Sequence, residues 1–146
     1  MSAYAERQHL PYAAAQLFDL VADVERYPEF MPWVIEARVR RRRGHTIMVD
    51  MTVGTGPLRK QFSTVATLNR PHRIDIISAD SIFNRFEQRW TFAPAAGGGS
   101  DVEYHVVFEF RSRLLQALMG ALFSDQAVAT MSAFKRRAHQ LYGGAS

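Results

Sequence analysis

Apolar and polar residues alternate along most of the chain, over residues 34–111, and this alternation constrains the fold more than any other feature. It is clearest over residues 102–110, where Val102, Tyr104 and Phe108 fall on the same side as other apolar residues. A period of two is that of a β-strand with one buried face. Turns containing Gly and Pro separate successive stretches, so the pattern predicts an antiparallel meander with one apolar face.

The meander divides into strands at its turn signals. The first predicted strand starts at residue 34 and runs into a turn at Arg43-Gly44, and the later strands cover residues 45–53, 58–68, 74–79, 84–92 and 102–110. Residues 3–10 predict one further strand before the meander. The segment Gly54-Thr-Gly-Pro57 lacks the third glycine and the Lys-Ser/Thr pair of a phosphate-binding loop, so we expect a tight turn there.

Helical spacing appears before the meander. Leu17, Leu20 and Val21 recur at helix spacing from residue 13 onward, which predicts a short amphipathic helix that ends before Pro28. Residues 26–33 contain two prolines and three aromatic residues. This composition disfavours a long helix and predicts an ordered aromatic loop or single turns.

A long helical region follows the meander, over residues 114–142. Its apolar stripe rotates by roughly 100° across Ser124, Asp125 and Gln126, at 3.6 residues per turn. We therefore expect a kink or break at these three residues, which could cap a second helix.

These elements predict a single α+β domain over residues 1–146, in which a curved antiparallel sheet wraps around a long C-terminal helix. A length of 146 residues and a hydrophobic content of 47% are enough for one core. Because the sheet must curve around the helix, the space between them can be either packed or hollow. Which of the two holds decides whether the protein has an apolar binding cavity.

Charge and cysteine content narrow the class of protein. The chain has no cysteine, a net charge of +4 and sixteen arginines against two lysines. Four arginines form a run at Arg40, Arg41, Arg42 and Arg43, which we call the arginine run. It predicts either a solvated hairpin tip or a contact with anionic lipid or nucleic acid, although no DNA partner is expected. No segment approaches the roughly 20 apolar residues of a spanning helix, so we expect a cytoplasmic protein with at most a peripheral contact to the inner face of the cytoplasmic membrane.

Catalytic and metal-binding patterns are not found in the sequence. The five histidines are scattered, and no nucleophilic serine motif occurs. The spacing of Asp19 and Asp23 places both on the exposed face of the first helix, where a solvated surface is the simpler interpretation. We therefore expect neither a metal site nor an enzyme.

Aromatic residues are abundant, with ten phenylalanines and two tryptophans. Two interpretations stay open, an ordinary core or an apolar ligand cavity whose methionines provide adaptable walls. Under the second interpretation the predicted ligand-binding residues are those expected to face inward: Phe30, Trp33, Val49, Met51, Phe62, Phe86, Gln88, Trp90, Tyr104, Val106, Phe108, Phe110, Leu115, Met119, Leu122, Phe123, Met131 and Phe134.

Three segments resemble a known family. The motif Asp23-Val-x-x-Tyr-Pro-x-Phe-x-Pro32, the strand Arg89-Trp-Thr-Phe-Ala-Pro94 and the segment beginning Phe110-Arg-Ser-Arg-Leu-Leu115 are similar to those of the coenzyme Q-binding START-domain family. That family lies within the polyketide cyclase/dehydrase-like, helix-grip (START/Bet v 1-like) superfamily and includes bacterial ribosome association toxins. Two departures stand out. Ala13 occupies a position where relatives commonly have a Ser or Thr helix cap, and Ser81-Ile-Phe83 replaces a frequent Gly-Pro-Phe.

The resemblance implies a hydrophobic tunnel between sheet and helix, and a non-enzymatic role in binding ubiquinone and supporting its delivery or function in respiratory electron transport. Ubiquinone would be a bound ligand, with no cofactor required. Inward-facing Tyr104, Gln88 or Trp90 would donate a hydrogen bond to the quinone ring. One alternative is a ribosome-binding inhibitor of translation that uses the arginine run with Arg136 and Arg137. A cyclase or hydrolase that uses the same cavity is a further alternative.

Overall fold

The computed structural model of the protein describes residues 2–143. Its strands are β1 (Ser2–Leu10), β2 (Val34–Arg43), β3 (Thr46–Thr55), β4 (Leu58–Asn69), β5 (Arg73–Ile77), β6 (Phe83–Pro94) and β7 (Ser100–Phe110). Its helices are α1 (Ala14–Ala22), the 3₁₀ helix η1 (Val24–Glu29) and α2 (Arg113–Tyr142). No helix among the described residues is long and apolar enough to cross a membrane.

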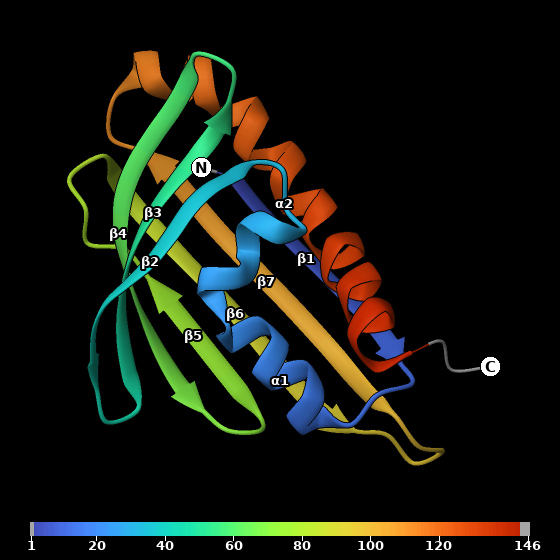
Figure 1. The fold of residues 1–146 in the computed structure, drawn as a ribbon. Coiled ribbons are helices and arrows are strands. Elements are labelled where there is room, and N and C mark those ends of the chain that lie inside the picture. The colour runs from blue at the N-terminus through green and yellow to red at the C-terminus, as the bar shows by residue number, and fades with distance from the viewer. Residues whose placement is uncertain (1, 144–146) are drawn as a thin grey trace.

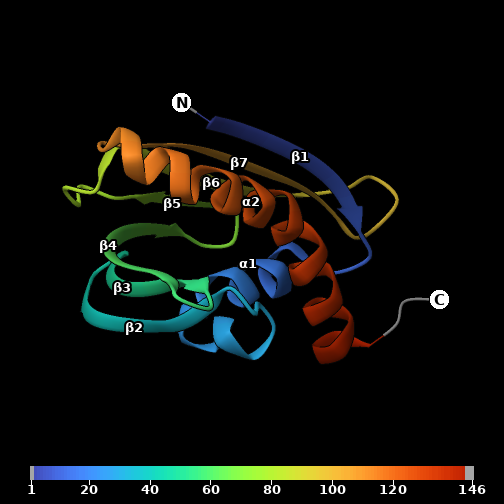
Figure 2. The same ribbon diagram turned by 90° about the horizontal axis from the view of Figure 1, so that it is seen from above.

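The strands form one antiparallel sheet of seven in the order β1-β7-β6-β5-β4-β3-β2. Strands β2 to β7 follow each other as a meander, as the alternation predicts. β1 pairs with β7 in a register that runs from Ser2 opposite Phe108 to Leu10 opposite Ser100. The sheet curves, and α2 lies across its concave side with its main sheet contacts on β1 and β7 (Figures 1 and 2). The expected helix-grip α+β fold is therefore confirmed.

The long helix differs from the sequence-based expectation in one respect. α2 is a single helix of 30 residues, and Ser124, Asp125 and Gln126 lie inside it, so of the two expected alternatives, a kink or a break, the break is wrong. Its axis nevertheless changes direction along its length (Figure 2). The Thr130 hydroxyl donates to the Gln126 carbonyl at 2.7 Å, a hydroxyl-to-backbone bond of the kind that often bends helices. A bend accommodates the rotating apolar stripe without ending the helix.

The segment between β1 and β2 follows its local sequence signals. α1 begins after Ala13, which provides no side-chain cap, but the Gln16 side chain accepts a hydrogen bond from the Ala13 amide at 3.0 Å. The aromatic segment forms the short helix η1 around Pro28 and buries Tyr27, in agreement with the predicted single turns. The ends of η1 and α2 are joined by Arg137 of α2, which donates to Glu29 at 2.9 Å.

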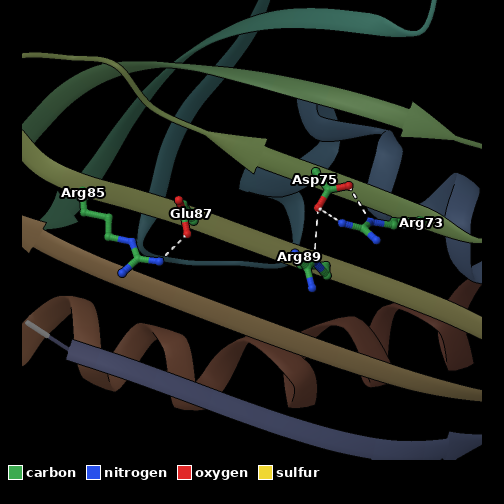
Figure 3. Close-up of polar contacts among 5 residues, drawn as sticks. All are labelled: Arg73, Asp75, Arg85, Glu87 and Arg89. Carbon is green, nitrogen blue, oxygen red and sulfur yellow. Dashed lines mark hydrogen bonds and ion pairs between the residues drawn. The ribbon is translucent and has the colours of Figure 1, made fainter.

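Ion pairs cross the outer, solvent-facing side of the sheet (Figure 3). Asp75 on β5 accepts from Arg73 at 2.6 Å and from Arg89 of β6 at 3.2 Å, and Arg85 donates to Glu87 at 2.8 Å. The hydrogen bond from Arg73 lowers the pKa of Asp75 below its ordinary value, although partial burial opposes this change. Three of the sixteen arginines are therefore paired with two carboxylates on this face.

These pairs make folding stability depend on acid pH. The Asp75 carboxyl has a lower pKa in the folded than in the unfolded state. Its contribution to folding stability is therefore fully present above the unfolded-state pKa, about 3.9, and is lost as pH falls through the folded-state pKa. We expect the melting temperature to fall below about pH 5, and D75N to show a shallower fall. At neutral pH the same substitution should cost at most about 1 kcal/mol, since the pair is partly exposed. D125N, at an exposed position of α2, is the control, and an equal pH dependence in both variants would contradict the assignment.

The turn between β3 and β4 contains two glycines, Gly54 and Gly56, and the steric need for glycine is stronger at Gly54. Gly54 has φ +142°, and a Cβ atom there would lie 1.8 Å from the Leu58 carbonyl oxygen. Its amide donates to the Trp33 carbonyl at 2.9 Å, which ties the turn to the start of β2. Gly56 also has a positive φ, +56°, but a Cβ there would meet open space. The predicted tight turn is therefore confirmed, with the main steric constraint at Gly54.

G54A should destabilise the protein by at least about 3 kcal/mol, because a backbone clash adds to an unfavourable φ. G56A should cost only about 1–2 kcal/mol, the penalty of a left-handed conformation alone. Urea unfolding followed by circular dichroism measures both variants against the wild type. Similar losses for the two would show that close packing at Gly54 is not the constraint.

Candidate functional site

A cavity of about 100 Å³ lies between α2 and the concave face of the sheet. Its walls come from η1 and the loop after it, from β2 to β7, and from α2. Its surface is mainly apolar, and none of the described residues that line it is Asp, Glu, His, Lys or Arg. The space between sheet and helix is thus partly hollow, but smaller than the 300–1,000 Å³ of a typical small-molecule pocket.

Most of the predicted ligand-binding residues line this cavity. They are Trp33, Val49, Met51, Phe62, Phe86, Gln88, Tyr104, Val106, Phe108, Phe123 and Phe134. Strands β3, β4, β6 and β7 present alternate residues here because the period-two pattern sets which side chains face inward.

The other predicted residues lie elsewhere in the core. Trp90 and Met131 line a separate void of about 10 Å³, next to α1. Phe110 and Met119 are buried without lining the cavity, while Leu115 and Leu122 pack partly exposed at the edge of the core. Phe30 is also partly exposed, and its ring packs against Phe134 at 5.2 Å between centroids. All of these residues belong to the core or pack against it, but none of them lines the cavity.

Much of the aromatic content is packed core. Phe123 of α2 contacts four phenylalanine rings of the sheet at centroid distances of 4.9–6.2 Å, those of Phe62, Phe83, Phe108 and Phe110. These tilted and edge-to-face geometries are the favourable ones for aromatic pairs. The two interpretations left open by the sequence therefore both apply, since the rings pack on each other and leave a small cavity among them.

Three polar residues of the lining were not predicted from the sequence, Thr64, Gln126 and Thr130. Thr64 donates to the Val49 carbonyl at 3.5 Å, and Thr130 donates to Gln126 as described above. The alternation of β4 contains Thr64 on its inward side, which is the signal that could have identified it. Gln126 and Thr130 gave no such signal, because the bend of α2 determines which of its faces meets the cavity.

A chain of hydrogen bonds connects the sheet to the helix at this site. The Trp90 indole donates to Gln88 at 3.3 Å, and the Gln88 amide donates to the Tyr104 hydroxyl at 3.2 Å. Tyr104 is also hydrogen-bonded to Thr130. The chain therefore runs from Trp90 through Gln88, Tyr104 and Thr130 to the backbone of α2.

The two buried tyrosines near the cavity remain neutral at physiological pH. Burial raises the pKa of Tyr104 well above its ordinary value, although its bonds with Thr130 and Gln88 act in the opposite direction. Burial also raises the pKa of Tyr27, whose hydroxyl donates to the Val21 carbonyl. Both side chains therefore act as neutral donors and acceptors, and neither is adjusted toward proton transfer near pH 7.

The arginines predicted to contact a partner lie on two different elements and differ in exposure. All four members of the arginine run are exposed on β2, and Arg40 lies 3.8 Å from Asp50 of β3. Arg137, in contrast, is engaged with Glu29 and with the Phe30 ring, 5.2 Å from its centroid, and only 17% of its side chain is exposed. Arg136 is exposed. Of the two helix arginines, Arg136 is the more available for an external contact.

Residues 10–135 match the family model described as polyketide cyclase / dehydrase and lipid transport. The ribosome association toxin RatA of Pseudomonas aeruginosa is 33% identical over 144 residues, covering 98% of this chain and 100% of that protein. The mitochondrial coenzyme Q-binding protein COQ10 homolog B of Xenopus laevis is 30% identical over 145 residues. That match covers 96% of this chain and 59% of the Xenopus protein.

Solved structures agree on the fold. A START superfamily protein from Mycobacterium smegmatis is similar with a TM-score of 0.79 and 16% identity, covering 95% of this chain and 98% of that one. The Zhui aromatase/cyclase from Streptomyces sp. R1128 is similar with a TM-score of 0.81 and 13% identity, covering 99% of both chains. At these identities the likeness concerns architecture, which binding proteins and enzymes share.

Proposed function

Because this chain belongs to the polyketide cyclase/dehydrase and lipid transport family, we propose that it binds a ubiquinone or a related polyprenyl lipid between sheet and helix and does not alter it chemically. The observation that carries the proposal is the apolar cavity, which contains neutral polar groups and no charged residue among the described residues that line it. The relative named as a coenzyme Q-binding protein, similar over 96% of this chain, supports quinone as the ligand class.

Elementary energetics supports an isoprenoid ligand. Each buried CH₂ group contributes roughly 0.8 kcal/mol, so a few isoprene units can provide useful affinity without any charged contact. A charged head group would be unfavourable in this cavity, because nothing in its lining could neutralise it. A ligand with a neutral, carbonyl-bearing ring and a hydrocarbon tail matches both properties.

The cavity volume sets a condition on binding. An enclosed apolar space of roughly 150 Å³ holds a benzene-sized molecule, and the space here is about 100 Å³. As it stands, the cavity is therefore too small for a whole benzene-sized ring. We propose that binding displaces η1 or part of α2, and that the remaining tail leaves through the partly exposed lining at Trp33, Met51 and Gln126.

The chemistry of the lining supports binding over turnover. General acid–base catalysis needs a group whose pKa lies near the working pH. The lining residues with a hydroxyl or amide side chain are Tyr27, Thr64, Gln88, Tyr104, Gln126 and Thr130. Burial raises the pKa of both tyrosines away from neutrality. We propose that the arginine run contributes by attracting the protein to the anionic inner leaflet of the cytoplasmic membrane, where such lipids reside.

Filling the cavity should abolish ligand binding without unfolding the protein. Ala127 is buried and lines the cavity, so A127L places three more carbon atoms in a space of about 100 Å³. We expect a short-tailed ubiquinone, titrated into the wild-type protein, to quench the fluorescence of Trp33. A127L should bind this ubiquinone at least about tenfold more weakly. A121L makes the same change at an exposed position of α2 and should match the wild type.

Organic extraction of protein purified from its native host, followed by mass spectrometry, provides a second readout. Retained quinone or polyprenyl lipid in wild type but not in A127L agrees with the proposal. No quenching, together with no extracted lipid, would contradict the proposed function.

A ribosome partner is the second candidate, favoured by the 33% identity to a ribosome association toxin over its full length. The arginine run would provide the contact with RNA phosphates. If so, the protein should co-sediment with large ribosomal subunits at low salt and dissociate steeply as salt increases. R41Q/R42Q should weaken this association more than R73Q/R89Q, whose arginines already neutralise Asp75. Absence of co-sedimentation at low salt would remove this candidate.

A further inference from the structure

We propose that the side-chain amide of Gln126 is the donor that recognises the ligand, through a hydrogen bond from Nε2 to a carbonyl oxygen of a quinone-type ring. The inference rests on the proposed function, because it takes a lipid bound in the cavity as given. It identifies a residue that selects the chemical class of that lipid, which an apolar wall alone does not do.

The first observation is an unsatisfied donor. Gln126 lines the cavity, and its Nε2 atom is buried without a hydrogen-bond partner among the described residues, the only buried side-chain nitrogen or oxygen there in that state. Nearly all buried polar groups in folded proteins have a partner. Leaving a donor unpaired costs about 1–3 kcal/mol, so its presence in the wall of a cavity indicates an acceptor that comes from outside the chain.

The second observation is that the other donors at the site are already engaged. Of the predicted head-group donors, Trp90 donates to Gln88 and Gln88 donates to the Tyr104 hydroxyl. The Tyr104 hydroxyl is in turn hydrogen-bonded to Thr130. A ligand that used one of them would have to break an existing bond. Gln126 can bind an acceptor at no such cost.

The third observation is the position of Gln126 on α2. The helix presents Phe123, Gln126, Ala127, Thr130 and Phe134 to the cavity, at the spacing of three and four residues that defines one helix face. The Thr130 hydroxyl holds the Gln126 carbonyl and so fixes the local backbone. The free amide therefore lies on the cavity-facing side of α2, with Phe123 one turn before it and Thr130 one turn after it.

Together these properties define the ligand class. The amide N–H₂ group donates, so it selects a neutral acceptor such as a quinone carbonyl over a hydrocarbon of the same shape. A phosphate head group would bring a charge into a lining that contains none to oppose it. Carbonyl-bearing prenyl lipids are thus favoured over polyprenyl hydrocarbons and polyprenyl phosphates.

The test compares two probes on three proteins. The probes are a benzoquinone with a two-isoprene tail and a benzene ring with the same tail, called the alkylbenzene below. The alkylbenzene has no hydrogen-bond acceptor. For Q126L we expect quinone affinity to fall about tenfold, the value of one hydrogen bond, and alkylbenzene affinity to stay within about twofold of wild type. Q140L makes the same change at an exposed position of α2 and should bind both probes as the wild type does.

Ligand-free stability gives a readout that a structural role would not produce. Replacing an unsatisfied buried donor by leucine removes its desolvation penalty, so the melting temperature of ligand-free Q126L should equal or exceed that of wild type. A residue needed for folding would show the reverse. Q126M provides a second apolar substitution of similar length if leucine does not fit.

The outcomes separate this inference from the function on which it rests. Unchanged quinone affinity in Q126L and Q126M would overturn the inference and leave the proposed function intact, and would indicate that water satisfies the amide. Equal weakening of both probes would overturn it as well, because it reports altered shape. If wild-type protein binds neither probe, the proposed function itself fails.

Discussion

The structure depends on covering a wide apolar sheet face with one helix. Seven strands about 4.8 Å apart span roughly 30 Å, whereas a helix with its side chains is about 10 Å across. A flat sheet would leave most of its apolar face in water. The sheet instead curves, α2 packs on β1 and β7, and α1 and η1 cover part of what remains. The cavity lies where these covering elements fail to meet.

The aromatic side chains limit the size of that cavity. Phe123 reaches from α2 into a group of phenylalanines on β4, β6 and β7, and Phe134 packs against Tyr27 and Trp90. Rings fill the curved space efficiently but cannot fill it completely, because tilted and edge-to-face pairs leave gaps at their corners. The same side chains that stabilise the fold therefore form the walls of the site, and ligand binding must rearrange part of the core.

Sequence reasoning succeeds where the signal is local. The alternation predicts the meander and the inward face of β7, and Val102, Tyr104 and Phe108 are buried as expected. It does not predict that β1 pairs with β7, because that contact joins residues about a hundred positions apart. The size of the cavity was equally out of reach, since it depends on how large rings interlock in three dimensions.

Gln126 shows a different limit. A polar residue at the point where an apolar stripe rotates has the pattern of a helix end, which predicts a possible cap. In the structure the helix continues and bends, so the same residue faces the cavity. Distinguishing the two requires knowledge of what lies opposite the helix, which is the cavity and the concave face of the sheet. Local periodicity does not contain that information.

The arginine run has a consequence that does not depend on any partner. β2 is one edge of the open sheet, and an exposed edge offers unpaired backbone groups to the edge of another molecule. Charged side chains and β-bulges are two ways in which proteins prevent such pairing. β2 has both, with four exposed arginines and register shifts at Val34/Glu36 and Val39/Arg41. Two copies approaching edge to edge would repel each other, so the run also protects the chain against self-association through its open sheet.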